Sequence, residues 1–308
     1  MSRQQFDRKL DARGVKLSAA DKTFGFFNGL FLILASLLTL VPVAQVLLTS
    51  FTPATDMLRP SSGILQIPSH FTVHNYVWLF RGSDRLISAY QITILRTVVG
   101  TAFSLLVTVM TAYPLSKKYL PGKKPVMLLF YFTMLFSGGI IPTYLVVDTL
   151  RLTDTFAALI LPCAMSVYNM ILMRTYFQSI PEELDESARL DGACDIRILF
   201  SIILPVSMPA LASIGLFYAV SHWNSYIDAV MYIRSRELWP LQLLMREILT
   251  NNSVAELSLG GLIEDPNRPN AQLIISVVIV VSALPIMCVY PFLQKYFVKG
   301  LMIGSIKG

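Results

Sequence analysis

Six long apolar blocks constrain the fold of this chain more than any other feature. Each block is about 20 residues or longer, which is the length of helix that crosses the roughly 30 Å hydrocarbon core of a bilayer. The blocks lie at residues 24–48, 87–112, 125–147, 156–177, 208–231 and 271–296. We therefore predict an all-α integral membrane protein with six transmembrane helices, one for each block.

The composition is typical of a membrane protein. Of the 308 residues, 54% are hydrophobic and only 14% are charged, and the mean hydropathy is +0.60. Soluble proteins have about 25% charged residues. The three cysteines lie far apart and form no pattern of a disulfide framework or a metal site. The first block is longer than the apolar part of a secretion signal and no small-residue cleavage site follows it, so we expect it to remain as a span.

The lysines predict which way the spans run. All of them fall on one side of the six predicted spans, and cytoplasmic loops are enriched in lysine and arginine. Both termini, the loop at 117–124 and the charged segment after the fourth block are therefore expected in the cytoplasm. The segments 49–86, 148–155 and 232–270 are expected to face outward.

The chain divides into a basic N-terminal arm at 1–23, a transmembrane domain at 24–298 and a short cytoplasmic tail at 299–308. The arm either determines topology or lies on the membrane surface. Within the long outer loop at 232–270, residues 241–249 have the pattern of an amphipathic helix. This helix either contacts an external partner or packs as a lid on the outer face of the membrane domain.

A charged segment between the fourth and fifth blocks, residues 179–205, is the clearest candidate for a functional site. It carries six acidic residues, which are Glu182, Glu183, Asp185, Glu186, Asp191 and Asp195. Charged side chains are costly inside lipid, so this segment is expected to protrude from the membrane. Leu184 and Ala188 are four residues apart and share a helix face, which we expect to be presented to a partner.

The charged segment is predicted to fold as two short helices joined by a turn. Ser179 and Glu182 have the spacing of a capping box at the start of the first helix. Gly192 is the residue type that most readily supplies the left-handed conformation at a helix end. The second helix is predicted at 195–203 and is expected to be closed by Pro205.

The spacing in this segment resembles the coupling loop of permeases of binding-protein-dependent ATP-binding-cassette (ABC) importers. That loop has the pattern Glu-Ala-Ala, three residues, glycine, nine residues and Ile-x-Leu-Pro. Six residues match at the same distances, and they are Glu186, Ala188, Gly192, Ile202, Leu204 and Pro205. Ser187 replaces the middle alanine, and this exchange of one small residue for another is expected to preserve the face.

Other segments extend the resemblance over essentially the whole chain, and they are similar to the carbohydrate-uptake branch of these permeases. They are the Ser-Gly-Gly-Ile-Ile-Pro-Thr-Tyr run at 137–144, the run at 158–162, Trp-Asn-Ser-Tyr at 223–226 and the ending at 294–300. The first of these runs most resembles permeases for complex oligosaccharides.

The resemblance implies a type I importer permease fold in a bacterial inner membrane, with a coupling helix between the fourth and fifth spans. Its partners would be a second homologous permease subunit, two ATPase subunits that hold ATP and Mg, and an extracellular or periplasmic solute-binding protein. The cargo would be a sugar or oligosaccharide, and membrane lipid would surround the spans. The chain itself would be no enzyme and would bind no cofactor or nucleic acid, and its sequence contains no phosphate-loop motif.

The resemblance also implies a set of residues that transmit force from the ATPase without taking part in any chemistry. These residues are Glu182, Glu183, Glu186, Ser187, Ala188, Asp191, Gly192 and Ala193.

Polar and aromatic residues in the spans are candidates for contact with solute. A sugar ring is bound by stacking on an aromatic ring and by hydrogen bonds to its hydroxyls. The candidates are Tyr144, Asn169, His222, Trp223, Asn224, Tyr226, Asp228 and Arg96. An interfacial aromatic belt with a helix–helix hydrogen bond is the alternative for those in the fifth span. Arg96 either lines the pathway or pairs with a residue inside the bundle.

Two other functions stay open from the sequence. One is an ABC permease for a solute other than a sugar. The other is an ATP-independent channel or secondary transporter, which is expected to carry more charged residues near the middle of the membrane than Arg96 alone. The three histidines form no visible catalytic triad or metal cluster, so an enzyme has no support.

Overall fold

The computed structural model describes residues 19–58, 67–81, 84–251 and 269–304, and over these ranges the chain is mostly helical and has no strand. Helices satisfy their own backbone hydrogen bonds, which is what the interior of a bilayer demands of any segment that crosses it. The prediction of a helical membrane protein is confirmed at this level, whereas the continuity of the single spans needs correction.

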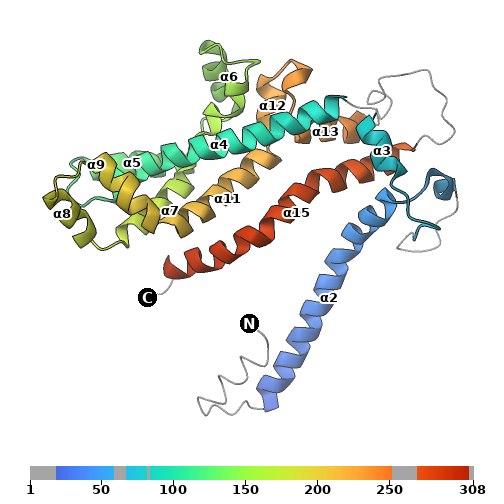
Figure 1. Cartoon of the computed structure of the whole chain (residues 1–308), viewed down its shortest axis with the longest axis horizontal. Helices are drawn as coiled ribbons and strands as arrows, with labels where there is room; N and C mark the ends of the chain where they lie inside the picture. The colour runs from blue at the N-terminus through green and yellow to red at the C-terminus, as the bar shows by residue number, and fades with distance from the viewer. Residues whose placement is uncertain (1–18, 59–66, 82–83, 252–268, 305–308) are drawn as a thin grey trace.

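Two helices match the first two predicted spans. α2 (Ala19–Ser50) and α4 (Asp84–Ser116) are each long and apolar enough to cross a membrane. α4 lies along the middle of the bundle, where it packs against α7 and α11 (Figure 1). α2 diverges from the bundle and contacts mainly α15, so its apolar surface is left exposed (Figure 1).

One further helix runs through the sixth predicted span without a break. α15 (Ala271–Gly304) contains an apolar stretch at Gln272–Cys288. It packs against α11 on one side and α2 on the other. Its N-terminal part also contributes Leu273, Ile274 and Val277 to the buried core.

The third predicted span is not one helix. α5 (Lys123–Leu135) and α6 (Ile140–Thr149) are bent relative to each other by 114°. Gly139, between them, has a φ of +89°, a region in which glycine carries no steric penalty. The prediction of a continuous helix over 125–147 is therefore wrong, because the Ser-Gly-Gly turn breaks it.

The fourth predicted span is also broken. It begins with two short 3₁₀ helices, η2 (Phe156–Leu159) and η3 (Leu161–Cys163), and continues with α7 (Val167–Gln178) at 55° to them. α7 has a start of its own, because the side chain of its N-cap residue, Ser166, accepts a hydrogen bond from the backbone N–H of Asn169.

The fifth predicted span, at 208–231, contains a break near its end. α11 (Met208–Asn224) stops where Ser225 adopts an extended conformation with φ of −75° and ψ of 133°, and α12 (Ile227–Tyr232) then begins after Tyr226. The expectation of a continuous helix is wrong at this point. The break places polar groups of the backbone inside the bundle, where they require partners.

The charged segment folds as predicted in outline. α8 (Glu183–Leu190) is followed by α9 (Asp195–Ile198), a π-helical turn η4 (Leu199–Ile203) and α10 (Leu204–Val206). The stretch from α9 to α10 lies at 87° to α11, so it crosses the end of the bundle. Pro205 does not close this helix as expected, because it stands in the first turn of α10, where a proline breaks no helical hydrogen bond.

Short helices cover the opposite end of the bundle (Figure 1). They are η1 (Ala54–Leu58), α3 (His74–Arg81), η5 (Arg236–Leu238) and α13 (Leu241–Asn251). The helix expected at 241–249 is thus confirmed as α13, and its apolar side is buried against α4 and α15.

Several expectations lie on residues that the structure does not describe. Most of the basic arm at 1–23, the end of the tail at 299–308 and the middle of the outer loop at 232–270 fall outside the described ranges.

Candidate functional site

The first helix of the charged segment starts differently from the sequence expectation. Ser179 does not cap α8, because α7 extends to Gln178 and the Ser179 hydroxyl donates to the backbone carbonyl of Tyr176 at 2.7 Å. The N-cap position of α8 is Glu182, which forms no capping hydrogen bond through its side chain. The expected capping box is therefore absent from this helix start. Acidic residues still occupy the first turn of α8, where the helix dipole favours negative charge.

The glycine turn after α8 is confirmed. Gly192 has a φ of +78°, and its N–H donates to the carbonyl of Arg189 at 3.0 Å. The N–H of Ala193 donates to the carbonyl of Ala188 at 3.0 Å. These two bonds satisfy carbonyls at the helix end, in the manner of a left-handed glycine cap. The turn reverses the chain and leads directly into α9.

The two faces of α8 have different surroundings. Ala188 is only 6% exposed and belongs to the core cluster formed with α4, α7 and α11. The expectation that Ala188 is presented to a partner is therefore wrong in this structure, because its small side chain lets α8 approach its own bundle. Leu184 and Leu190 are 39% and 89% exposed. Six coupling candidates are also exposed, and they are Glu182, Glu183, Glu186, Ser187, Asp191 and Gly192.

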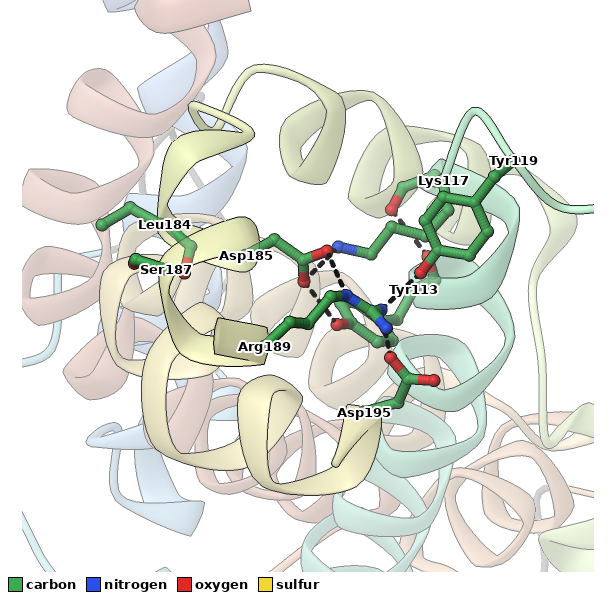
Figure 2. A network of polar contacts seen from close by, with 9 residues as sticks. Tyr113, Lys117, Tyr119, Leu184, Asp185, Ser187, Arg189 and Asp195 are labelled. Atoms are coloured by element: carbon green, nitrogen blue, oxygen red, sulfur yellow. Dashed lines mark hydrogen bonds and ion pairs between the residues drawn. The ribbon is translucent and has the colours of Figure 1, made fainter. Parts of the chain in front are cut away.

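A polar network anchors the inner face of α8 to the end of α4 (Figure 2). The carboxylate of Asp185 accepts hydrogen bonds from Lys117 Nζ at 2.7 Å and from the Tyr113 hydroxyl at 3.1 Å. Its other oxygen accepts from Arg189 Nε at 3.2 Å. Arg189 also pairs with Asp195 and donates to the Tyr119 hydroxyl. One buried carboxylate thus joins α8 to α4, and one arginine joins α8 to α9.

This network favours the ionised form of Asp185. Burial raises the pKa of the carboxyl, but hydrogen bonds from Lys117 and Arg189 outweigh burial and leave the pKa below its ordinary value. The hydrogen bond to Asp185 likewise raises the pKa of the Arg189 guanidinium.

Beside the network, the end of α4 and α8 enclose a pocket of about 410 Å³, lined partly by Lys118 and Glu182. The ion pair between these two exposed side chains contributes little, since solvent screens it.

Asp185 and its partners were not among the residues that the sequence predicted as coupling residues. Asp185 and Arg189 do carry a local signal, because their spacing of four residues places opposite charges on one helix face. The contacts to Tyr113 and Lys117 carry no such signal, since these residues lie about 70 positions earlier in the chain. They meet Asp185 only through the packing of α8 against α4.

Two of the solute candidates meet at a second pocket between α7 and α11. Asn169 and His222 line this pocket, which has a volume of about 570 Å³. Its other lining residues are Cys163, Met165, Ser166, Tyr168, Phe217, Tyr218 and Ser221. The hydroxyl of Tyr218 is 2.6 Å from that of Thr108 and accepts the N–H of Ser166 at 3.0 Å. Tyr168 and Tyr218 are aromatic residues that the sequence did not single out.

Four other candidates are not among the residues that line this pocket. Trp223 is buried, and its indole N–H donates to the carbonyl of Ser282 at 3.2 Å. Tyr144 stacks on Tyr232, with ring centroids 6.2 Å apart. The ring of Tyr226 faces the guanidinium of Arg246, and the Asn224 amide donates to a carbonyl of its own helix.

The last two candidates form a buried ion pair. Arg96 on α4 is fully buried and pairs with Asp228 in the first turn of α12, and Asp228 is itself only 8% exposed. Of the two arrangements that the sequence left open for Arg96, the structure contains the pairing within the bundle.

A bundle of apolar, partly broken helices with a charged two-helix segment across one end defines a helical integral membrane protein. The chain belongs to the family described as binding-protein-dependent transport system inner membrane component, which it matches over residues 18–303.

Its relatives include transport permeases of bacteria. It is 41% identical over 283 residues to the polygalacturonan/rhamnogalacturonan transport system permease protein YtcP of Bacillus subtilis, covering 90% of this chain and 96% of the relative. It is 40% identical over 289 residues to protein LplC of the same organism, covering 94% of this chain and 96% of LplC.

A solved structure shares the fold. A chain of a bacterial ABC transporter involved in the import of the acidic polysaccharide alginate matches with a TM-score of 0.85 and 33% identity, covering 92% of this chain and 99% of that one. The expected importer permease fold is confirmed by this likeness.

Proposed function

We propose that this chain is a permease subunit of an ATP-driven importer that moves a sugar or oligosaccharide across a bacterial inner membrane. The family and the polysaccharide cargo named for two of its relatives support this proposal. An external solute-binding protein delivers the sugar, and a second homologous permease subunit completes the pathway. Two ATPase subunits hold ATP and Mg and supply the energy, so this chain itself catalyses no reaction.

The observation that carries the proposal is the two-sided character of α8. Its inner face is fixed to α4 through Asp185 and packed through Ala188. Its outer face leaves Leu190 almost fully exposed beside acidic residues. The leucine and the acidic side chains beside it are available for contact with a partner protein. We assign this face to the ATPase, which pushes on α8 and thereby on α4 when it binds ATP.

The pocket lined by Asn169 and His222 is the region proposed for contact with the sugar in this subunit. Tyr168 and Tyr218 offer aromatic rings, and the amide and imidazole offer hydrogen-bond partners for hydroxyls. Asn224 is exposed at the end of α11, the helix that carries Tyr218 and His222.

The topology proposed for the chain has six spans and both termini in the cytoplasm. The six are α2, α4, α5 with α6, the η2–α7 pair, α11 with α12, and α15, each counted as one span. The orientation rests on the lysines at the end of α4, because cytoplasmic loops are enriched in lysine and arginine. Lys117 contacts α8, and Lys123 donates to the carbonyl of Lys117 at 2.9 Å, so these lysines lie at the same end of the bundle as α8.

Reconstitution tests the proposal. The complex is isolated from native membranes through a tag on this chain, placed in liposomes, and supplied with its binding protein. Uptake is measured for oligosaccharides from polygalacturonan and alginate, with phosphate and a peptide as non-sugar solutes. We expect ATP-dependent uptake of at least one oligosaccharide and of neither non-sugar solute. Uptake that needs no ATP, or a purified complex without an ATPase, contradicts the proposal.

A further inference from the structure

The break between α11 and α12 exposes a backbone carbonyl that the helix no longer uses. Ser225 is extended, so its carbonyl has left the regular helical ladder. Arg96 Nη1, from α4, donates to this carbonyl at 3.1 Å. A broken helix is tolerated in a membrane where neighbouring helices supply such partners. Arg96 therefore supplies a partner for the carbonyl that follows the end of α11.

The same guanidinium also holds the start of the next helix. Arg96 Nη2 pairs with the carboxylate of Asp228. The other carboxylate oxygen accepts from the Ser225 hydroxyl at 2.8 Å and from the N–H of Ala229 at 2.9 Å. One side chain on α4 thus bridges both sides of the break, and it does so from a position with no solvent exposure.

A buried ion pair is a weak source of stability, because taking both charges out of water offsets most of their attraction. Its better-supported role is to select one arrangement among alternatives, since removing one partner leaves an uncompensated charge. The pair is also incompletely satisfied. Arg96 Nε and the hydroxyls of Thr97 and Thr101 are buried without a hydrogen-bond partner among the described residues. Each unsatisfied donor at a native site calls for an explanation, such as strain or a bound water.

The break is close to the pocket proposed for the sugar. His222 precedes Ser225 by three residues and lines that pocket. Its ring lies against Gly100 so closely that an added Cβ there would be 2.8 Å from it. Gly100 and Arg96 are four residues apart on α4 and share a face. The position of α12 relative to α4 is therefore tied to the position of a pocket-lining side chain.

We propose that Arg96 and Asp228 form a latch across the break in the fifth span, which holds α12 in the orientation described above and must release for solute to pass. Both are positioning residues, because they act on the pocket through Ser225 and α11. A latch of this kind gives the bundle two discrete arrangements, as alternating exposure of a site requires. The inference rests on the proposed function.

The test compares uptake with ATP hydrolysis in the reconstituted complex. For Asp228→Asn and Arg96→Gln, we expect the number of sugars moved per ATP to fall at least tenfold, while hydrolysis continues and no longer depends on the sugar. The exchange Arg96→Asp with Asp228→Arg restores a pair of opposite sign and is expected to return the ratio to within threefold of the unmodified complex. Asp148→Asn and Arg234→Gln remove exposed charges and serve as matched controls.

Each outcome separates a latch from a pair that only stabilises the fold. If the two residues only stabilise the fold, the amount of complex falls but the sugars moved per ATP stay constant, and the latch is wrong. If the variants of Arg96 and Asp228 do not assemble, the variant Ser225→Ala decides. It removes one hydrogen bond to Asp228 and leaves both charges of the ion pair in place. A reduced ratio in that variant supports the latch, and an unchanged ratio overturns it. Failure of the unmodified complex to import any sugar refutes the proposed function instead.

Discussion

Asp185 is the residue on which the attachment of α8 depends most. Its carboxylate accepts hydrogen bonds from Lys117, Tyr113 and Arg189, so three donors converge on one buried acid. A hydrogen bond to a charged group contributes more than one between neutral groups. The network makes the position of α8 relative to α4 a property of these few side chains.

Asp185→Asn is expected to loosen α8 from α4. The amide keeps the size of the side chain but removes the charge that Lys117 and Arg189 face, which costs about 1–3 kcal/mol. We expect the variant to insert into the membrane normally and to lose several-fold in sugar-stimulated ATP hydrolysis of the complex. Asp148→Asn, an exposed carboxylate on α6, controls for the chemical change. Stimulation equal to that of the unmodified complex argues against a role for the network.

The same network predicts a dependence of stability on pH. Because the folded-state pKa of Asp185 lies below its ordinary value, its contribution is fully present above the unfolded value of about 3.9. The contribution is lost as the pH falls through the lower folded pKa. The difference in unfolding temperature between the unmodified chain and Asp185→Asn should be constant from neutral pH to about pH 5 and should shrink below about pH 4. A constant difference over the whole range contradicts this assignment.

For single residues, the sequence predicts a role correctly where that role depends only on neighbours in the chain. Gly192 is such a residue, because its left-handed conformation follows from the helix end that it forms. Ser179 illustrates the limit, since the capping pattern is present but Ser179 stands at the C-cap of α7 instead of at the start of α8. Asp185 needs Lys117, a distant residue that only the packed bundle brings near it.

Among the elements, the broken helices were the largest departure from expectation. Apolar length alone predicts a span, and it is nearly the same for a straight helix and for two short helices at an angle. Gly139 and Ser166, the N-cap of α7, are of residue types that often end or begin helices. Glycine and serine also occur inside continuous helices, so their presence alone does not predict a break. At the break, the carbonyl of Ser225 accepts a hydrogen bond from Arg96, which lies 129 positions earlier. No local pattern reports such a partner.

The glycine turn between α8 and α9 gives a prediction with an internal control. Gly192 and Gly29 both have no atom within 4 Å of an added Cβ, but only Gly192 has a positive φ. Gly192→Ala should therefore cost about 1–2 kcal/mol through its backbone alone, and Gly29→Ala in α2 should cost nothing. We expect Gly192→Ala to weaken retention of the ATPase during purification while membrane insertion is unchanged. Equal retention by the two variants contradicts the prediction.

The contact between α4 and α11 gives a second prediction at this scale. An alanine at position 100 places its Cβ 2.8 Å from the ring of His222, and such overpacking costs about 1–3 kcal/mol. Gly100→Ala should lower the unfolding temperature of the detergent-solubilised chain. In a His222→Ala background the same substitution should cost at least about 1 kcal/mol less, because the clashing ring is gone. Additive effects of the two substitutions would show that the contact is unimportant.

For the whole molecule, α4 connects the two sites. Lys117 meets α8 at its C-terminal end, and Arg96 meets the break near α12, 21 residues away or about 32 Å along a helix. α4 runs from Asp84 to Ser116 and contains Pro114 in its last turn. Under the proposed function, a displacement of α8 by an ATPase reaches the pocket region through this one helix. This arrangement gives the proposed ATPase a path from its contact on α8 to the pocket proposed for the sugar.

Replacement of the exposed leucine at the end of α8 tests the central claim most directly. Leu190 is 89% exposed in this chain, so Leu190→Asp has little effect on the fold of the subunit itself. The measurement is ATP-driven sugar uptake by the reconstituted complex, together with the amount of ATPase that co-purifies. Leu150→Asp at the end of α6, where the leucine is 62% exposed, controls for the added charge. We predict that Leu190→Asp loses both the ATPase and the uptake while the chain still inserts. Undiminished uptake with a full complement of ATPase would contradict the assignment of α8 as the site where the ATPase acts.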